Sequence, residues 1–229
     1  MPVIDPAHDA HRVFDAISQS GGVAIVPLDV AYAVFGSSGD AIQKIFTAKG
    51  RSFTKPNGML GNFEIFRELH QPTPNEQAIV RAVIEDYDLP MSVVAPFRGD
   101  HPIFSRVDSF AMERSTKAGT LDLLLNSGPL ARALAHQSLE RLQPVLGSSA
   151  NRSLSGSKFR LQDIEKEVRD IAAIQIDYGL CRYHNAEGIS STIIDLKTFK
   201  VHRYGVCFDQ IADIFQRHFG ITLAPKPAA

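Results

Sequence analysis

The feature that most constrains the fold is the alternation of two hydrophobic patterns along the whole chain. Short apolar runs bounded by glycine, proline or serine, at residues 23–26 and 92–95, are typical of buried strands. Between such runs lie segments with apolar residues three or four positions apart, as at residues 75–87 and 208–219, which is typical of amphipathic helices. This alternation predicts an α/β fold whose sheet is covered by helices on both faces.

The same patterns predict the remaining elements. The clearest helix starts at Asp40, which can cap it with Gln43 three residues later, and ends at Gly50. Further helices are expected at residues 8–19, 129–142 and 161–171. Further strands are expected at residues 109–112, 121–125, 144–147, 173–177, 191–196 and 200–204.

We expect one domain over residues 1–229. A chain of 229 residues suits one large α/β domain, and it has no internal repeat, low-complexity linker or abrupt change of composition. A last helix is expected within 207–219, followed by a tail, 224–229, whose two prolines favour a frayed end.

The composition favours a globular protein over a disordered, nucleic-acid-binding or membrane-spanning one. Hydrophobic residues make up 44% and charged residues 21%, which favours a packed core over disorder. The net charge of −1 provides no overall field for nucleic acid or an anionic membrane, so RNA binding is not favoured. Two cysteines without C-x-x-C spacing, no signal-peptide pattern and no apolar stretch of ~20 residues predict a cytoplasmic protein without a membrane span.

A cluster of cations follows the helix that ends at Gly50. Lys49, Arg51 and Lys55 fall within seven residues. Such cations can simply complement the carbonyl end of a helix in solvent. They can also form a phosphate clamp, in which arginine supplies a planar pair of donors and lysine a point charge.

Two polar segments lie next to predicted strands. Residues 147–156 are rich in serine and contain Ser149 and Asn151, and Ser191 and Thr192 open the strand at 191–196. A strand-to-helix turn of this kind can bind phosphate or ribose, but an ordinary polar loop and an ordinary strand start have the same composition. The eight histidines have no HExxH spacing, so no metal site is predicted.

Taken in order, these segments resemble the YrdC-like family, which includes YrdC, YciO and threonylcarbamoyl-AMP synthase. That family typically has Pro-Thr-Asp-Thr-x-Tyr-Gly, Lys-x-Arg-Pro with Lys-Pro-Leu, a Pro-Gly-Pro-x-Thr strand, an Arg-bearing strand, Ser-Ala-Asn-x-Ser-Gly, Ser-Thr-Val-Val-Asp-Leu and Arg-x-Gly. The corresponding segments here are 27–33, 49–51 with 55–56, 89–92, 149–151, 191–196 and 203–205. The resemblance covers about residues 10–206.

The resemblance implies a twisted mixed or parallel sheet, flanked by helices, around a basic cavity. It implies a nucleotidyltransferase that converts ATP, bicarbonate and L-threonine into threonylcarbamoyl-AMP and pyrophosphate, with Mg²⁺ accompanying the ATP. Partner proteins then pass the threonylcarbamoyl group to tRNA, in threonylcarbamoyladenosine biosynthesis. Such a reaction needs positioning and charge neutralisation more than a nucleophile.

The resemblance also implies roles for particular residues. Lys49 and Arg51 would be catalytic and hold phosphates. The nucleotide would contact Lys55, Ser149, Asn151, Ser191, Thr192 and Arg203. The amino-acid pocket would be walled by Leu28, Val30 and Tyr32.

Several positions depart from the family pattern. Leu28 and Val30 replace both threonines of the Pro-Thr-Asp-Thr stretch, which removes two hydroxyls from the expected amino-acid pocket. On the strand expected to bear an arginine, Glu113 takes its place and Arg114 comes one residue late, so that it would face the other side. These departures leave two alternatives open: an enzyme of this fold with a different carbamoyl or amino-acid substrate, or a module that binds nucleotide or RNA without turnover.

Overall fold

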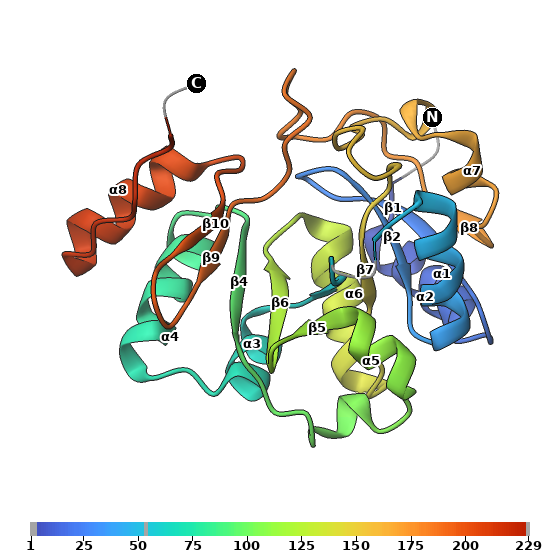
Figure 1. Cartoon of the computed structure of the whole chain (residues 1–229), viewed down its shortest axis with the longest axis horizontal. Coiled ribbons are helices and arrows are strands. Elements are labelled where there is room, and N and C mark those ends of the chain that lie inside the picture. Colours follow the sequence, from blue (N-terminus) through green and yellow to red (C-terminus); the bar gives the residue numbers. More distant parts are fainter. Residues whose placement is uncertain (1–3, 53–54, 228–229) are drawn as a thin grey trace.

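The computed structural model describes residues 4–52 and 55–227 (Figure 1). Ten strands form one sheet in the order β10-β9-β4-β6-β3-β7-β2-β1-β8, with β5 paired to β6. The strands are β1 Ala24–Pro27, β2 Tyr32–Gly36, β3 Gly58–Leu60, β4 Met91–Pro96, β5 Thr116–Lys117, β6 Thr120–Leu125, β7 Leu146–Ser149, β8 Ile174–Gln175, β9 Ile193–Asp195 and β10 Val201–Arg203.

The sheet is mixed, as the resemblance implied. The pairs β1/β8, β3/β6 and β4/β9 run parallel, and the other pairs run antiparallel. The α-helices are α1 Pro6–Ile17, α2 Gly39–Lys49, α3 Phe63–His70, α4 Pro74–Arg81, α5 Ser109–Ser115, α6 Pro129–Glu140, α7 Lys166–Arg169 and α8 Phe208–Phe219. In Figure 1, α8 lies beyond the β9/β10 edge, and α1 lies towards the opposite edge.

Two hydrophobic cores hold the helices to the sheet. In the smaller core, Phe14 of α1 and Leu134 of α6 pack with Val26 and Ala33 of the sheet. The larger core joins the other face of the sheet to the buried sides of α2, α3, α4 and α8. Covering both faces in this way gives the α/β architecture that the alternating patterns predicted.

The central strand β6 separates the core from the functional side. Its residues Leu121, Leu123 and Leu125 are fully buried, whereas Thr120, Asp122 and Leu124 are half-buried on the opposite face. Successive side chains of a strand point to opposite faces, so one set fills the larger core and the other faces a cavity.

One predicted strand is wrong. Residues 109–112 belong to helix α5, because Asp108 caps it and its carboxylate accepts a hydrogen bond from the Ala111 amide at 2.9 Å. Glu113 and Arg114 therefore lie at the end of a helix, and the argument from a one-residue slip on a strand does not apply to them. The two strands that follow are β5, which carries Lys117, and β6, which contains no cation.

Several boundaries also differ from the sequence expectations. Helix α2 is capped by Ser38 rather than Asp40, although Gly50 ends it with φ 56° as predicted. The helix predicted at 75–87 is capped by Thr73 and Glu76, and it continues as a π-helical turn over Ala82–Asp86. The segment 161–171 contains only a 3₁₀ turn and the single turn α7.

Two expectations concern the ends and the membrane. The predicted tail, 224–229, includes residues 228–229, which lie outside the described residues. Within the described part of the chain, no helix has the length and apolar character that crossing a bilayer requires.

Candidate functional site

A cavity of about 530 Å³ opens on the face of the sheet that carries Asp122 and Leu124. Strands β2 to β7, β9 and β10 contribute to its wall, together with the turn between β1 and β2 and the end of α5. A cavity of this size is typical of small-molecule sites.

One side of the cavity is apolar. Leu28, Val30 and Tyr32, which were expected to wall an amino-acid pocket, lie in the wall of this cavity, and Phe35 and Leu124 extend the same surface. The Tyr32 hydroxyl donates to Asp177 Oδ1 at 2.6 Å and also contacts the Gly179 carbonyl at 2.9 Å. Burial, reinforced by Asp177, raises the pKa of Tyr32, so the phenol stays protonated and acts as part of the wall.

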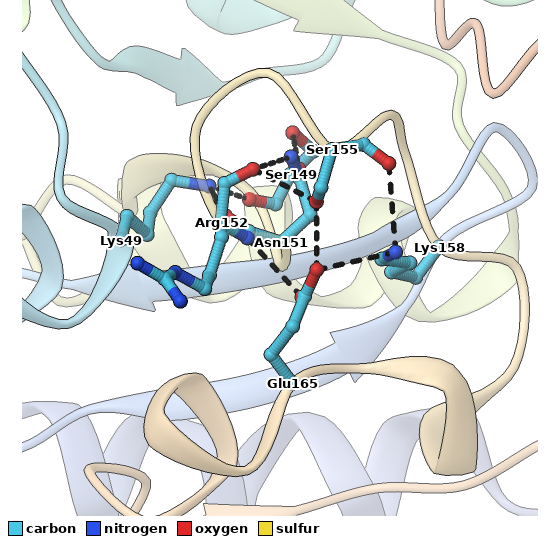
Figure 2. A network of polar contacts seen from close by, with 7 residues as sticks. All are labelled: Lys49, Ser149, Asn151, Arg152, Ser155, Lys158 and Glu165. Atoms are coloured by element: carbon cyan, nitrogen blue, oxygen red, sulfur yellow. Dashed lines mark hydrogen bonds and ion pairs between the residues drawn. The ribbon is translucent and has the colours of Figure 1, made fainter.

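Lys49 is not in the cavity wall. It is 2% exposed, and its ammonium group donates to the backbone carbonyls of Ser149 and Asn151, the latter at 2.6 Å (Figure 2). Burial, with the nearby charge of Arg51, lowers the pKa of Lys49 to about 7. The structure therefore places Lys49 behind the 149–151 loop, where it holds the loop in place, rather than at a phosphate position.

The serine-rich loop is fixed from its other side by Glu165. This carboxylate accepts hydrogen bonds from Ser155 Oγ at 2.7 Å and the Arg152 amide at 3.2 Å, and it pairs with Lys158 at 3.2 Å (Figure 2). Partial burial alone would raise the pKa of Glu165, but these donors outweigh it and hold the pKa at about 2. No sequence motif pointed to Glu165, because it contacts the loop from ten or more residues away.

Ser149 and Asn151 occupy different positions. Ser149 lies in the cavity wall, and its hydroxyl donates to Asn151 Oδ1 at 2.5 Å. The Asn151 amide donates to the Arg152 carbonyl at 2.5 Å, and its side chain is buried within the loop. Asn151 therefore shapes the loop and does not line the cavity.

The two remaining cations of the basic cluster are also separated. Arg51 lines the cavity, where its guanidinium donates to the carbonyls of Lys55 at 3.0 Å and Pro56 at 2.6 Å. The side chain of Lys55 is exposed and lies outside the wall. Of the three clustered cations, Arg51 is the one whose side chain faces the cavity.

Ser191 and Arg203 form the polar edge of the site. The Arg203 guanidinium donates to the Ser191 carbonyl at 2.7 Å and to its hydroxyl at 2.9 Å, and both residues line the cavity. Gly205 permits this arrangement, because a Cβ there would lie 2.2 Å from the Ser191 carbonyl carbon. Thr192, which was expected to contact the nucleotide, is fully buried and does not line the cavity, and its hydroxyl donates to the Val206 carbonyl at 2.9 Å.

Asp122 is a cavity residue that the sequence reasoning missed. Its Oδ1 atom is buried without a hydrogen-bond partner among the described residues. Burial raises the pKa of Asp122 to about 6, although Arg203, the Ser92 hydroxyl and His202 act in the opposite direction. The available signal was a single aspartate within the otherwise apolar run at residues 121–125.

The charges of the wall are mixed. Arg51, Lys117 and Arg203 are its lysine and arginine residues, and Asp122 and Asp195 are its carboxylates. The cavity is therefore less basic than the resemblance implied. In the described ranges, no group of three histidine, cysteine, aspartate or glutamate side chains could hold a metal ion.

Comparison with known proteins decides the family. A family model named for Sua5, YciO and YrdC, with the description "Telomere recombination", matches residues 16–205. The chain belongs to the Sua5/YciO/YrdC family. No curated protein matches the sequence.

Solved structures of low sequence identity share the fold. The hypothetical protein smu.1377c from Streptococcus mutans UA159 is 20% identical with a TM-score of 0.73, over 93% of this chain and 92% of that one. P. abyssi Sua5 complexed with L-threonine is 21% identical with a TM-score of 0.70, over 96% of this chain and 59% of that one. Full-length HypF in its phosphate- and nucleotide-bound form is 14% identical with a TM-score of 0.58, over 85% of this chain and 28% of that one.

Among the site residues implied by the family pattern, the structure brings seven together and sets four apart. The seven that line one cavity are Leu28, Val30, Tyr32, Arg51, Ser149, Ser191 and Arg203. Lys49, Lys55, Asn151 and Thr192 do not line it. Most residues at the family-pattern positions thus line the cavity, whereas Lys49 and Asn151 stabilise the loop behind it.

Proposed function

We propose that this protein is an adenylate-forming nucleotidyltransferase that binds Mg²⁺·ATP and an amino acid in the cavity. The observation that carries the proposal is the union, in one cavity, of an apolar pocket and a polar edge. The pocket is built around Leu28, Val30 and Tyr32, and the polar edge contains Arg51, Ser149 and Arg203. The threonine bound by P. abyssi Sua5 and the nucleotide bound by HypF, both of this fold, support the pairing of ligands.

The proposed reaction is that of threonylcarbamoyl-AMP synthase. The neutral amine of L-threonine combines with CO₂ from bicarbonate to form a carbamate, and the proton that the amine loses joins the hydroxide left by bicarbonate as water. A carbamate oxygen then attacks the α-phosphorus of ATP, and the bond to the β-phosphate oxygen breaks to release pyrophosphate. Mg²⁺ would be bound to the phosphates of ATP and would neutralise part of their negative charge.

The protein's contribution is positioning and charge neutralisation. Arg51 and Arg203 offer charged donors for phosphate oxygens in the cavity, and the Ser149 hydroxyl offers a neutral one. Lys49 and Glu165 contribute indirectly, because they fix the loop that carries Ser149. The product would then pass to partner proteins of tRNA modification.

The test is pyrophosphate release from Mg²⁺·ATP and bicarbonate, with and without L-threonine, and with the other amino acids in parallel. Each of Arg51→Ala and Arg203→Ala should lower turnover about 10- to 100-fold, since each removes charge-assisted hydrogen bonds. Arg12→Ala, which removes an exposed arginine of α1, is the matched control. If all three variants release pyrophosphate at the wild-type rate, the site assignment is wrong.

A second candidate is an enzyme of this family with a different amino-acid substrate. Leu28 and Val30 favour it, because they place apolar side chains where the family pattern has threonine hydroxyls. ATP would then bind without threonine-dependent turnover, and a Leu28→Thr/Val30→Thr double variant should gain threonine use. A purely binding module, including an RNA-binding one, would bind without releasing pyrophosphate with any amino acid.

A further inference from the structure

The cavity wall contains polar groups that the fold itself leaves unsatisfied. Asp122 Oδ1, Ser115 Oγ and Ser148 Oγ are buried and have no hydrogen-bond partner within the described ranges. They come from β6, the end of α5 and β7, and all three residues line the cavity. Buried polar groups without partners are costly, so such a set indicates a place where a ligand supplies the missing contacts.

Asp122 carries the charge in this set. The charged or titratable groups that share the cavity wall are Arg203 and His202 from β10, Asp195 from β9, Lys117 from β5, Tyr32 from β2 and Arg51. Among the described residues, none of them forms an ion pair with Asp122 within 4.0 Å. Arg203 is instead directed to Ser191 by two hydrogen bonds.

The surroundings leave room for this carboxylate. Neighbouring Gly58 has no side chain, and a Cβ there would lie 3.4 Å from Asp122 Oδ2. Burial raises the pKa of Asp122 to about 6, which is still below 7, so the carboxyl group is mainly ionised at neutral pH. The cavity wall therefore contains a carboxylate that has no ion-pair partner within 4.0 Å among the described residues, although the charge of Arg203 acts on it from further away.

We propose that Asp122 binds a primary ammonium group of the second substrate. This deepens the proposed function and rests on it, because it names the chemical class of the molecule that shares the cavity with the nucleotide. An ammonium group has three donors and no acceptor, which complements a carboxylate and hydroxyl groups. An anionic group at this position would instead be repelled by Asp122.

A divalent cation fits the same wall less well. Mg²⁺ in proteins is usually bound by one or two carboxylates together with phosphates and waters. The second carboxylate of the wall, Asp195, already accepts hydrogen bonds at Oδ1 from the amides of Lys197 and Thr198, at 3.0 and 2.8 Å. Asp122 Oδ1 has no hydrogen-bond partner among the described residues, although the Ser92 hydroxyl contacts the same carboxylate. One unpaired carboxylate oxygen favours an ammonium ligand over a metal.

The experiment is calorimetric binding without ATP to the full-length protein. The ligands are L-threonine, L-lysine, putrescine and L-lactate, the last having no amine. The variants are Asp122→Asn, which has the same shape, and Asp100→Asn, an exposed aspartate, as the charge-matched control. We expect Asp122→Asn to weaken every amine that binds about 10- to 100-fold, through loss of a charge-assisted hydrogen bond, while Asp100→Asn leaves it unchanged. Which amines bind separates amino acids from diamines as the source of the ammonium group.

The pH dependence of amine binding gives a second test, which can be made with the wild-type protein alone. Wild-type affinity for amines should fall as the pH is lowered through about 6, the pKa of Asp122. Where Asp122→Asn folds, the part of this dependence that disappears in it belongs to the carboxylate, which separates it from the contribution of His202.

Three results would overturn the proposal. They are no amine binding to the wild type at millimolar concentration, equal amine binding by wild type and Asp122→Asn, or a loss of ATP affinity in Asp122→Asn that occurs only with Mg²⁺ present. Nucleotide binding is measured separately by titration with ATP. Failure of ATP to bind, with amine binding intact, would remove the proposed function and leave the ammonium site.

Discussion

Replacing Lys49 by methionine distinguishes a phosphate-binding lysine from one that holds a loop. The change keeps most of the apolar stem and removes the ammonium group, which donates to the carbonyls of Ser149 and Asn151. Hydrogen bonds to a charged group contribute about 1.5–3 kcal/mol each, and removing a costly buried ammonium offsets part of that loss. We expect a net decrease of about 2–4 kcal/mol in the free energy of unfolding.

The assay is urea unfolding at pH 6, together with ATP binding to the folded variant. Lys44→Met is the matched control, because Lys44 lies on the same helix and donates to a single carbonyl, that of Gly21 at 2.8 Å. It should lower the free energy of unfolding by no more than about 1 kcal/mol. A Lys49→Met protein that is as stable as wild type but has lost ATP affinity would refute our reasoning. It would show that Lys49 binds the phosphates of ATP.

The pH dependence of stability provides an independent check on Lys49. Its pKa is about 7 in the folded protein, against 10.5 in the unfolded chain, so the unfolded state binds more protons between these values. Relative to the neutral amine, the charged form of Lys49 lowers the stability of the folded protein, and this effect is fully present below pH 7 and is lost as the pH rises towards 10.5. Wild type should therefore gain stability relative to Lys49→Met across this range.

Glu165→Gln should loosen the serine-rich loop, because the carboxylate pairs with Lys158 and accepts from Ser155 and Arg152. Since the pKa of Glu165 is about 2 when folded and 4.5 when unfolded, the stability it provides is present above pH 4.5 and is lost as the pH falls towards 2. Urea unfolding of wild type and variant at pH 7 and pH 3 measures this; an equal difference at both pH values would contradict it. Gly205→Ala should destabilise the protein by about 2–4 kcal/mol, since its Cβ would overlap the backbone of residues 190–192. Thermal unfolding against Gly99→Ala, where a Cβ meets only Phe97 at 3.9 Å, tests this, and equal melting temperatures would show that the chain can shift.

The elements that sequence predicted well are those with a strong local pattern. Residues 208–219 form α8 as expected, and the apolar run at 121–125 lies within β6. Residues 109–112, expected to be a strand, form a helix because Asp108 caps it. Asp108 precedes the apolar run, so the apolar pattern alone did not reveal the cap. Local patterning thus identifies an element, and its caps decide its type and its ends.

The cavity wall was predictable only in part, because two cations that are close in sequence have different structural roles here. Lys49 and Arg51 are two positions apart, yet one is buried behind a loop and the other lines the cavity. The spacing of charges in a motif does not say which of them faces a ligand. That depends on contacts such as those of Glu165 with Ser155 and Lys158, which join segments distant in sequence.

The placement of these charges also orders the two proposed ligands within the cavity. A triphosphate is attracted to Arg51 and Arg203 and repelled by the carboxylate of Asp122. An ammonium group has the opposite preferences, so the amine should lie nearer Asp122 and the phosphates nearer the arginines and Ser149. The bound ammonium group would have to lose a proton before it forms the carbamate, whose oxygen then attacks the α-phosphate held in the same cavity. Neutralising Asp122 should therefore strengthen ATP binding while it weakens amine binding. An Asp122→Asn protein that changed both affinities in the same direction would show that the two ligands are not separated in this way.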